Sequence, residues 1–345
     1  MTTRERDAKD DDGDGDDDFS AFTIVVDASA CGGLERDALH CIAFAAPSAL
    51  AESEADVDEA RAAAAAVNRV AFDDIERERA IDAAWARRVR ENELLFNATK
   101  FRFASARNAN ANDVMMTTRP SARVVVELGI TDYKTFLCTN LSADWRTYVR
   151  DEGLSAPETV TVGAPATSSD SSLDRRYRHF ADALGNCVTL HTMDDKFMML
   201  ERSESVGEAP GAVVFPGGHA EPSEVPTLGT SGADVSQLMF TAAMDELEEE
   251  LGVRQEHITR ILCLGITRRV VNARSCMIFY AECALTAADV LALYPSAKHG
   301  FESHRAFPAA LHDFQNPEFM SRVPGDHCGA ADLLLKFLSA RTTSK

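Results

Sequence analysis

The stretches FPGGHAEPSE (residues 215–224) and LMFTAAMDELEEELGV (residues 238–253) contain the signals that decide the fold. The first is typical of a strand that ends at a Pro-Gly-Gly turn, where glycines let a ligand or an ion approach the backbone. The second has the spacing of a helix. Glu246, Glu249 and Glu250 are spaced i, i+3 and i+4, so they fall within roughly 100° of arc on one face of that helix.

An apolar arc lies beside these carboxylates on the same helix. Packing of this arc on a sheet would hold the carboxylates at the rim of the sheet, whereas Asp245 and Glu248 would point elsewhere. Gly252 is expected to end the helix in the left-handed conformation. The arc consists of Phe240, Ala243, Leu247 and Leu251.

Carboxylates crowded on one face repel one another, and a bound cation removes that penalty. Oxygen ligands suit Mg²⁺ or Mn²⁺, ions that also bridge substrate phosphates. For an isolated acidic run, an ordinary solvated face is the alternative. The glycine turn before the helix favours a metal site.

The composition limits the kinds of partner. The chain has 345 residues, a formal net charge of −20 and a hydrophobic fraction of 45%. Nucleic-acid binding relies on clustered Lys and Arg, so this charge argues against a nucleic-acid partner. Residues 1–20 contain eight Asp and one Glu against three basic residues, and we expect a solvated, disordered tail there. A binding arm for a basic partner is the alternative.

The distribution of cysteines and apolar residues indicates the compartment. The eight cysteines are scattered, with no CxxC pair or zinc-type spacing, so we expect reduced thiols. No run of 18 apolar residues is present and the acidic start is unlike a leader peptide. We expect a soluble, intracellular, cytoplasmic protein without a membrane partner. The oligomeric state stays open.

Periodicity predicts two folded parts. The N-terminal part should be α+β, with a helix at about 75–92 whose buried stripe is Ile81, Trp85 and Val89. The C-terminal part should hold several short strands and one central acidic helix, as in a mixed sheet between helices. Helices are expected at 235–251, 286–294 and 329–340, and strands at 186–192, 196–201, 211–216, 260–267 and 275–285. The expected division is a tail at 1–20, an N-terminal domain at 21–154 with an insertion at 45–68, a linker at 155–173 and a C-terminal domain at 174–345.

The glycine turn and the acidic helix resemble the Nudix box, G-x5-E-x7-R-E-U-x-E-E-x-G-U, in which U is a bulky aliphatic residue. Gly218 and Glu224 match its first element, and DELEEELGV (residues 245–253) matches its last element except at the first position. Residues 225–244 stand where the box has seven residues, and we expect them to form a surface loop. Asp245 replaces the arginine that usually pairs with the glutamate at the position of Glu224.

A narrower resemblance covers residues 80–310. The chain is similar to the uridine diphosphate glucose pyrophosphatase branch of the Nudix hydrolases, which shares an inserted box. The fold class implied is α/β (α+β): a Nudix α/β/α sandwich with a mixed sheet, preceded by a smaller α+β domain that helps to select the nucleotide. The matching stretches are AAWARRVRENELLFNATKFRF, LGITDYKTFLCTN, LERSESVGEAPGAVVFPGGHAEP, DELEEELGV, RSCMIFYAECALT and FESHRAF.

The resemblance implies roles for individual residues. Glu246 and Glu250 would be the principal Mg²⁺ ligands, with Glu249 as a further, water-bridged or catalytic carboxylate. Gly217 or Gly218 would offer a backbone carbonyl. Ser303 would be a further metal ligand. Glu302 would be either the base that takes a proton from the attacking water or a loop cap.

Substrate contacts are implied for a second set of residues. Arginine suits phosphate because its donors are forked and always charged. Aromatic side chains can stack on the nucleoside, although an aromatic residue in a strand or turn more often packs in a core. The set consists of Phe96, Tyr133, Arg202, Gly207, Val214, His219 and Glu221.

The reaction implied is Mg²⁺-dependent hydrolysis of UDP-glucose or UDP-galactose to UMP and hexose 1-phosphate. Another nucleoside diphosphate derivative is the first alternative substrate. A Nudix-fold protein that binds nucleotide sugars without cleaving them is a second alternative, suggested by Asp245.

Overall fold

The computed structural model describes residues 18–43, 65–93, 95–109, 123–149, 158–163, 175–204, 208–222 and 232–343. The acidic tail, most of the predicted insertion and linker, Gly207 and Glu224 therefore lie outside the described residues. No helix in the described ranges is long and apolar enough to cross a bilayer.

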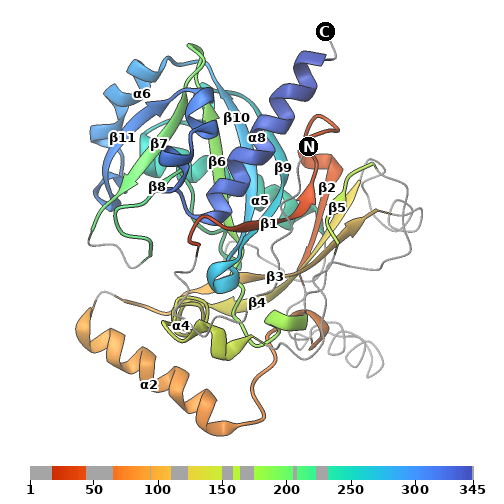
Figure 1. The fold of residues 1–345 in the computed structure, drawn as a ribbon, viewed down its shortest axis with the longest axis vertical. Coiled ribbons are helices and arrows are strands. Elements are labelled where there is room, and N and C mark those ends of the chain that lie inside the picture. The colour runs from red at the N-terminus through yellow and green to blue at the C-terminus, as the bar shows by residue number, and fades with distance from the viewer. Residues whose placement is uncertain are drawn as a thin grey trace, which may run out of the picture.

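The larger of two sheets has eight strands and is mixed (Figure 1). Its strands are β1 (Phe22–Asp27), β5 (Val160–Thr161), β6 (Gly185–His191), β7 (Phe197–Arg202), β8 (Val213–Val214), β9 (Ile258–Arg269), β10 (Ser275–Cys283) and β11 (Ser303–Ala309). They follow the order β11-β7-β6-β10-β9-β1-β5, and β8 pairs with β7 outside this path. The β6/β10 and β1/β5 pairs are parallel, whereas the other pairs are antiparallel.

Helices cover both faces of this sheet, so the predicted fold class is confirmed. Helix α5 (Gly232–Leu251) shares one core cluster with Val188 and Met277, and α8 (Gly325–Thr343) shares another with Cys187 and Ile278. Neighbouring residues on one strand thus enter opposite cores, as the alternation of side chains requires. The remaining helices of the C-terminal half are α6 (Ala287–Leu293) and the short α7 (Pro317–Met320).

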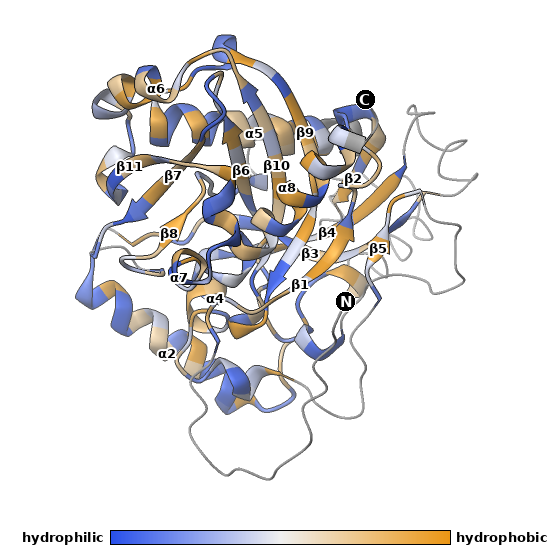
Figure 2. Cartoon of the chain, turned by 45° about the horizontal axis from the view of Figure 1, so that its top comes forward, coloured by the Kyte–Doolittle hydropathy of each residue, from blue (hydrophilic) through white to orange (hydrophobic). Residues whose placement is uncertain are grey.

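The smaller sheet lies against the other side of α5. Its strands are β2 (Leu39–Ala43), β4 (Val124–Asp132) and β3 (Thr99–Asn108), with β2 parallel and β3 antiparallel to the central β4. The strand β4 is largely hydrophobic (Figure 2). Phe103 and Val126 belong to the same core cluster as the apolar face of α5. The backbone N–H of Cys41 also donates to Ser236 Oγ of α5 (2.9 Å).

Helix α2 (Ile75–Glu91) flanks the smaller sheet through α4 (Tyr133–Cys138). Asp74 caps its start by accepting a hydrogen bond from the backbone N–H of Glu76 (3.0 Å). Of the predicted stripe, Ile81 is buried and Trp85 is half-buried against Leu137 and Cys138. The helix is thus held by a narrow apolar face, and most of its surface is hydrophilic (Figure 2).

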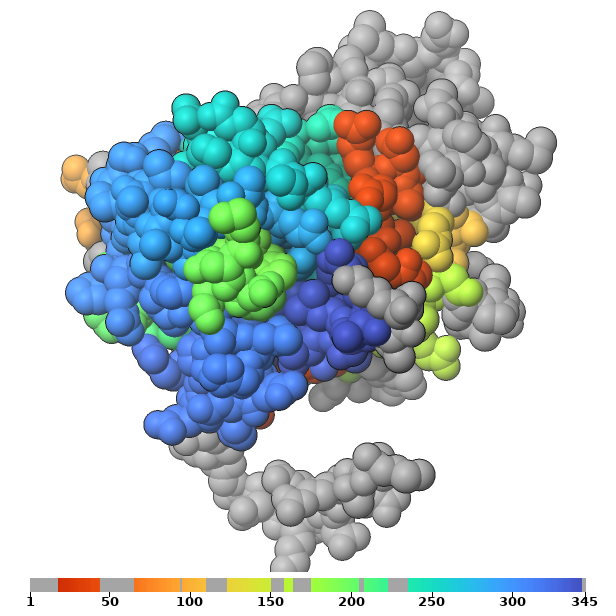
Figure 3. Space-filling model, turned by 90° about the horizontal axis from the view of Figure 1, so that it is seen from above, coloured from red at the N-terminus to blue at the C-terminus, as the bar shows by residue number. Residues whose placement is uncertain are grey.

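The predicted domain boundary does not coincide with the division into sheets. Strand β1 precedes the smaller sheet in the chain, yet it pairs with β9 of the larger sheet. Residues 160–161, which lie in the predicted linker, form β5 beside β1. Seen from above, N-terminal residues in red lie directly against C-terminal residues in teal (Figure 3). The two predicted domains stay a prediction, but the N-terminal segment contributes strands to both sheets.

Two further details differ from the sequence prediction. Helix α5 begins at Gly232, so residues 232–244 are helical and the insertion is not wholly a loop. The physical reason is that Val235, Met239 and Ala242 recur at helical spacing and are buried. Strand β11 was not predicted, because its burial does not alternate along Ser303–Ala309.

Asp182 connects the two sheets. Its carboxylate accepts from Arg268 Nη2 of β9 and from Ser275 Oγ of β10, both at 2.8 Å. Its backbone C=O accepts from the N–H of Phe103 in β3 (2.9 Å), and its N–H donates to Asn140 Oδ1 (3.1 Å). Asp182 and Arg268 are 2% and 4% exposed, so they form a buried ion pair.

Replacing Asp182 with Asn should lower the free energy of unfolding by about 3 kcal/mol, because Arg268 would keep a buried charge without its counter-ion. Asn tolerates the positive φ of 44° at this position, so the change isolates the charge. Urea unfolding measures the effect. Glu76→Gln, which breaks the exposed Glu76–Arg79 pair, is the matched control and should change stability little. Equal effects of the two changes would contradict this role for Asp182.

Candidate active site

The carboxylates of α5 are arranged as the sequence predicts. The apolar arc of Phe240, Ala243, Leu247 and Leu251 is buried, while Asp245 and Glu248 are exposed. Glu250 is 5% exposed, and Glu246 and Glu249 are half-buried. The helix ends at Gly252, whose φ of +73° and N–H donation to the carbonyl of Glu248 (2.9 Å) confirm the predicted cap.

The Gly217-Gly218 turn is hydrogen-bonded to this helix face. The backbone N–H of Gly217 donates to Glu250 Oε2 (2.8 Å), and the N–H of His219 donates to Glu246 Oε1 (3.2 Å). A Cβ atom on Gly217 would overlap with the backbone carbonyl of Asn186, and one on Gly218 would displace the carboxylate of Glu246, so the two glycines permit this close approach. The turn and the carboxylates therefore form one unit.

Asn186 of β6 attaches the same turn to the sheet. The N–H of Gly218 donates to Asn186 Oδ1, and the N–H of Asn186 donates to the carbonyl of Gly218, both at 2.8 Å. The Gly218 carbonyl, which is one of the predicted metal ligands, thus already accepts one hydrogen bond. A carbonyl oxygen has a second lone pair for another partner.

Burial shifts the two inner carboxyl groups strongly. Burial and the nearby charge of Glu246 together raise the pKa of Glu250 to about 8, although the hydrogen bond from the N–H of Gly217 lowers it. Burial, together with the charge of Glu249, raises the pKa of Glu246 to about 7. Crowded carboxyl groups with such pKa values favour either a proton or a bound cation beside them.

Glu249 faces Lys298 and His299 on the segment that follows α6. Its carboxylate forms an ion pair with Lys298 Nζ, and Oε2 lies 3.3 Å from His299 Nδ1. The N–H of His299 donates to the carbonyl of Glu249 (2.7 Å). The carboxylate of Glu249 therefore already has side-chain partners, one of which is the cationic Lys298.

The three glutamates line an open cavity of about 800 Å³, here called the carboxylate cleft. A second cavity of about 370 Å³, the arginine pocket, lies beside it and is lined by Arg202, Arg269 and Arg274. Gly217, Gly218, His219 and Glu302 line both cavities, so the two meet at the glycine turn.

The predicted substrate residues are brought to these cavities in part. Tyr133, Arg202, Val214 and His219 line the arginine pocket. Glu221 lines the carboxylate cleft and pairs with Lys100 Nζ of β3. Phe96 lines neither cavity and is 73% exposed, so it does not pack in a core.

Glu302 and Ser303 lie side by side at the start of β11. Ser303 is buried, and its carbonyl accepts from the hydroxyl of Tyr294 (3.1 Å). The backbone of Glu302 donates to the carbonyl of His299 (3.0 Å) and accepts from Ser203 (2.9 Å). The loop-capping contacts of Glu302 are thus made by its backbone, while the residue lines both cavities.

The donor set fits a hard divalent cation at Glu246 and Glu250. Among the described residues, no three His, Cys, Asp or Glu side chains are already arranged to hold a metal ion together. Glu246 and Glu250 supply oxygen donors that are crowded, largely buried and raised in pKa, which is the situation that a cation relieves. Glu249 would join them only by leaving Lys298 and His299.

Several site residues were missed by the sequence prediction. Asn186, Lys100, Arg269 and Arg274 come from β6, β3, β9 and the residue before β10, far from the acidic helix in the chain. Only the fold brings them to the glycine turn. Lys298 and His299 lie just before FESHRAF, and their position close to Glu302 was the only signal for them.

Comparisons with known proteins define the family. Nudix hydrolase 9 from Arabidopsis thaliana is 34% identical over 82% of this chain and 86% of its own length. The uridine diphosphate glucose pyrophosphatase NUDT22 is 30% identical in Mus musculus, over 66% of this chain and 68% of its own. In Homo sapiens it is 31% identical, over 69% and 72%. A solved MutT protein from Methanosarcina mazei Go1 matches 47% of this chain and 95% of its own, with 17% identity and a TM-score of 0.30. No family model matches.

An acidic helix that faces a glycine turn at a mixed sheet defines the class of diphosphate hydrolases predicted above. The chain belongs to the Nudix hydrolase family, as its relative from Arabidopsis thaliana shows. The predicted resemblance to the uridine diphosphate glucose pyrophosphatase branch is confirmed as well, and so is the prediction of an enzyme. Nudix hydrolases generally use divalent metal ions.

The metal-free protein should lose stability as pH rises from about 4.5 to about 8. Glu246 and Glu250 have raised pKa values in the folded state, so folding takes up protons in this window and their contribution is lost at higher pH. Thermal unfolding with a chelator between pH 5 and 8 measures the slope. Glu250→Gln should flatten it, whereas Glu248→Gln at the exposed neighbour should not. An unchanged slope in Glu250→Gln would contradict the buried titration.

Proposed function

We propose that the enzyme hydrolyses UDP-glucose or UDP-galactose to UMP and hexose 1-phosphate in a Mg²⁺-dependent reaction. The observation that carries this proposal is the junction of the carboxylate cleft with the arginine pocket at the Gly217-Gly218 turn. The mammalian relatives are uridine diphosphate glucose pyrophosphatases, and this supports the substrate class.

The two cavities suit different parts of such a substrate. The carboxylate cleft is acidic, so a diphosphate would enter it together with cations that balance both charges. Glu246 and Glu250 would hold Mg²⁺, which when bound neutralises the diphosphate and acidifies a bound water. Lys100 and Lys298, which also line the cleft, add positive charge at its walls.

Arg202 is the residue best placed to meet a phosphate near the junction. It lines the arginine pocket, and its Nε donates to the carbonyl of Glu208 (3.0 Å), which orients the guanidinium plane. In the antiparallel register of β7 and β11, Arg202 lies opposite Ser303, the residue after Glu302. A forked, permanently charged donor in that position suits a diphosphate oxygen.

Glu302 is favoured over Glu249 as the proton acceptor. The carboxylate of Glu249 is already occupied by Lys298 and His299. Glu302 reaches both cavities, and within the described part of the chain no hydrogen bond or ion pair of its carboxylate is found. It would accept a proton from water that attacks phosphorus at the junction.

The aromatic residues of the N-terminal half are proposed to contact the nucleoside. Tyr133 lines the arginine pocket at the start of α4, and its neighbour Phe136 lines it too. Phe96 is exposed in the segment between α2 and β3, where a ring without core contacts is available for stacking. The substrate would then be read by residues from both halves of the chain.

Purified protein with Mg²⁺ should release UMP from UDP-glucose or UDP-galactose, and Glu250→Gln should lower kcat on the order of 100-fold or more, since a principal metal ligand is lost. Glu76→Gln, on α2 and outside both cavities, is the control and should leave kcat unchanged.

A panel of nucleoside diphosphate derivatives decides between the alternatives. Cleavage of another member without cleavage of either UDP-hexose would overturn the substrate. Binding without cleavage of any member would identify a binding protein. Full turnover by Glu250→Gln would overturn the metal assignment.

A further inference from the structure

Unpaired polar atoms gather at the arginine pocket. In native proteins more than about 90% of buried polar groups have a hydrogen-bond partner. Within the described residues, Asn186 Nδ2, His219 Nε2 and Arg274 Nε are buried without a hydrogen bond, and all three residues line this pocket. Arg274 Nε faces Asp326 Oδ2 at 3.6 Å, which is an ion-pair contact beyond hydrogen-bond distance. Such a concentration at a cavity wall indicates a ligand that supplies the missing partners.

The orientation of the Asn186 amide is determined by its neighbour. The backbone N–H of Gly218 donates to Oδ1, so this atom is the carbonyl oxygen and Nδ2 is the donor on the other side. The residue is 3% exposed, and water therefore reaches it poorly. Asn186 thus holds the catalytic turn with one end of its amide and offers a donor with the other.

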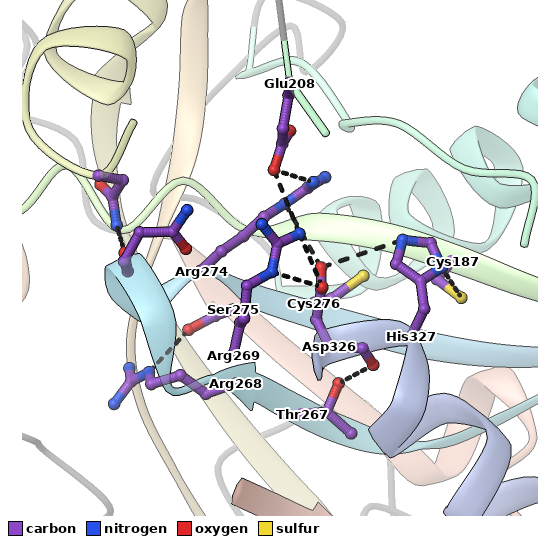
Figure 4. Close-up of polar contacts among 12 residues, drawn as sticks. Cys187, Glu208, Thr267, Arg268, Arg269, Arg274, Ser275, Cys276, Asp326 and His327 are labelled. Carbon is purple, nitrogen blue, oxygen red and sulfur yellow. Dashed lines mark hydrogen bonds and ion pairs between the residues drawn. The ribbon is translucent and has the colours of Figure 1, made fainter. Parts of the chain in front are cut away.

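Arg269, Arg274 and Glu208, which line the pocket, form an alternating set of charges with Asp326 (Figure 4). Arg274 Nη1 contacts Glu208 (2.6 Å), and Arg269 Nη2 contacts both Asp326 (2.8 Å) and Glu208 (3.3 Å). Two guanidinium groups and two carboxylates balance each other. This wall has no surplus positive charge for a phosphate, so it suits an uncharged group.

His219 adds a buried ring nitrogen, Nε2, which has no hydrogen-bond partner among the described residues. This atom can accept or donate a hydrogen bond according to the tautomer. Tyr133 and Phe136 complete the wall with aromatic surface, against which a flat or ring-shaped group can pack.

We propose that the arginine pocket binds an uncharged ring of the substrate, and that Asn186 Nδ2 and Arg274 Nε donate hydrogen bonds to carbonyl or hydroxyl oxygens of that ring. The inference rests on the proposed nucleotide-sugar substrate and adds two specificity-determining residues to it. Both the nucleobase and the hexose carry such oxygens. The diphosphate stays at the junction, where the carboxylate cleft begins.

Asn186→Asp tests the proposal with one atom. The new carboxylate still accepts from Gly218 but presents an oxygen in place of the Nδ2 donor, which leaves an acceptor facing an acceptor. Calorimetry without added metal, which prevents turnover, should give a Kd for UDP-glucose that is raised about tenfold. Asn108→Asp makes the same change on β3 away from both cavities, and should leave this Kd unchanged.

Two further ligands locate the ring. If the Kd of UMP rises as well, the pocket reads the nucleobase, and if only that of UDP-glucose rises, it reads the hexose; both results support the proposal. Inorganic pyrophosphate should bind wild type and Asn186→Asp equally. A loss of pyrophosphate binding as large as that of UDP-glucose would overturn the proposal, because the added charge would then act on the diphosphate.

Arg274→Lys is the second variant. It is needed if thermal unfolding shows no cooperative transition for Asn186→Asp, which would mean that this variant does not fold. Arg274→Lys keeps a positive charge near Glu208 but removes the Nε donor, and the same loss is expected. Unchanged Kd values in the folded variants would overturn the proposal and would indicate that these atoms bind buried water. The proposal would also be overturned if the wild-type protein bound neither UDP-glucose nor UMP. Binding without release of UMP after Mg²⁺ is added would instead overturn the proposed reaction alone.

Discussion

The site depends on the contact between two backbone N–H groups and two carboxylates. Gly217 and His219 donate to Glu250 and Glu246, and this fastens the glycine turn to the C-terminal end of α5. The contact relies on glycine at position 217, where a side chain would overlap with the backbone of Asn186, and at position 218, where a side chain would displace the Glu246 carboxylate. It also buries the carboxyl groups, which raises their pKa values and makes the position suitable for a cation.

The smaller sheet is part of the same arrangement. Helix α5 packs between the two sheets, so its apolar residues contact the core residues of both sheets, while its carboxylates stay at the rim. Lys100 of β3 reaches Glu221 beside the glycine turn, and Asp182 joins β3 to β9 and β10. The residues proposed to contact a substrate and the carboxylates of α5 are thereby carried by one connected core.

Local features of the site were predictable from the sequence because they follow from periodicity. The carboxylate arc, the apolar arc and the Gly252 cap all lie within one helix, where spacing alone determines which residues share a face. Contacts between distant segments were not predictable in this way. Asn186 meets Gly218 only through the pairing of strands, and β1 joins β9 across most of the chain. The helix over residues 235–251 was predicted from its spacing and is confirmed by α5, whereas the expectation of a surface loop over residues 225–244 did not take account of the same spacing.

The pairing of Glu249 with Lys298 and His299 bears on how a cation could reach this carboxylate. The segment from Lys298 to Glu302 is bound into one turn by the hydrogen bond from the N–H of Glu302 to the carbonyl of His299. Lys298 therefore supplies a positive charge to Glu249 from within the protein. A cation that bound Glu249 would compete with Lys298 for this carboxylate, beside the turn that also carries Glu302, the proposed proton acceptor.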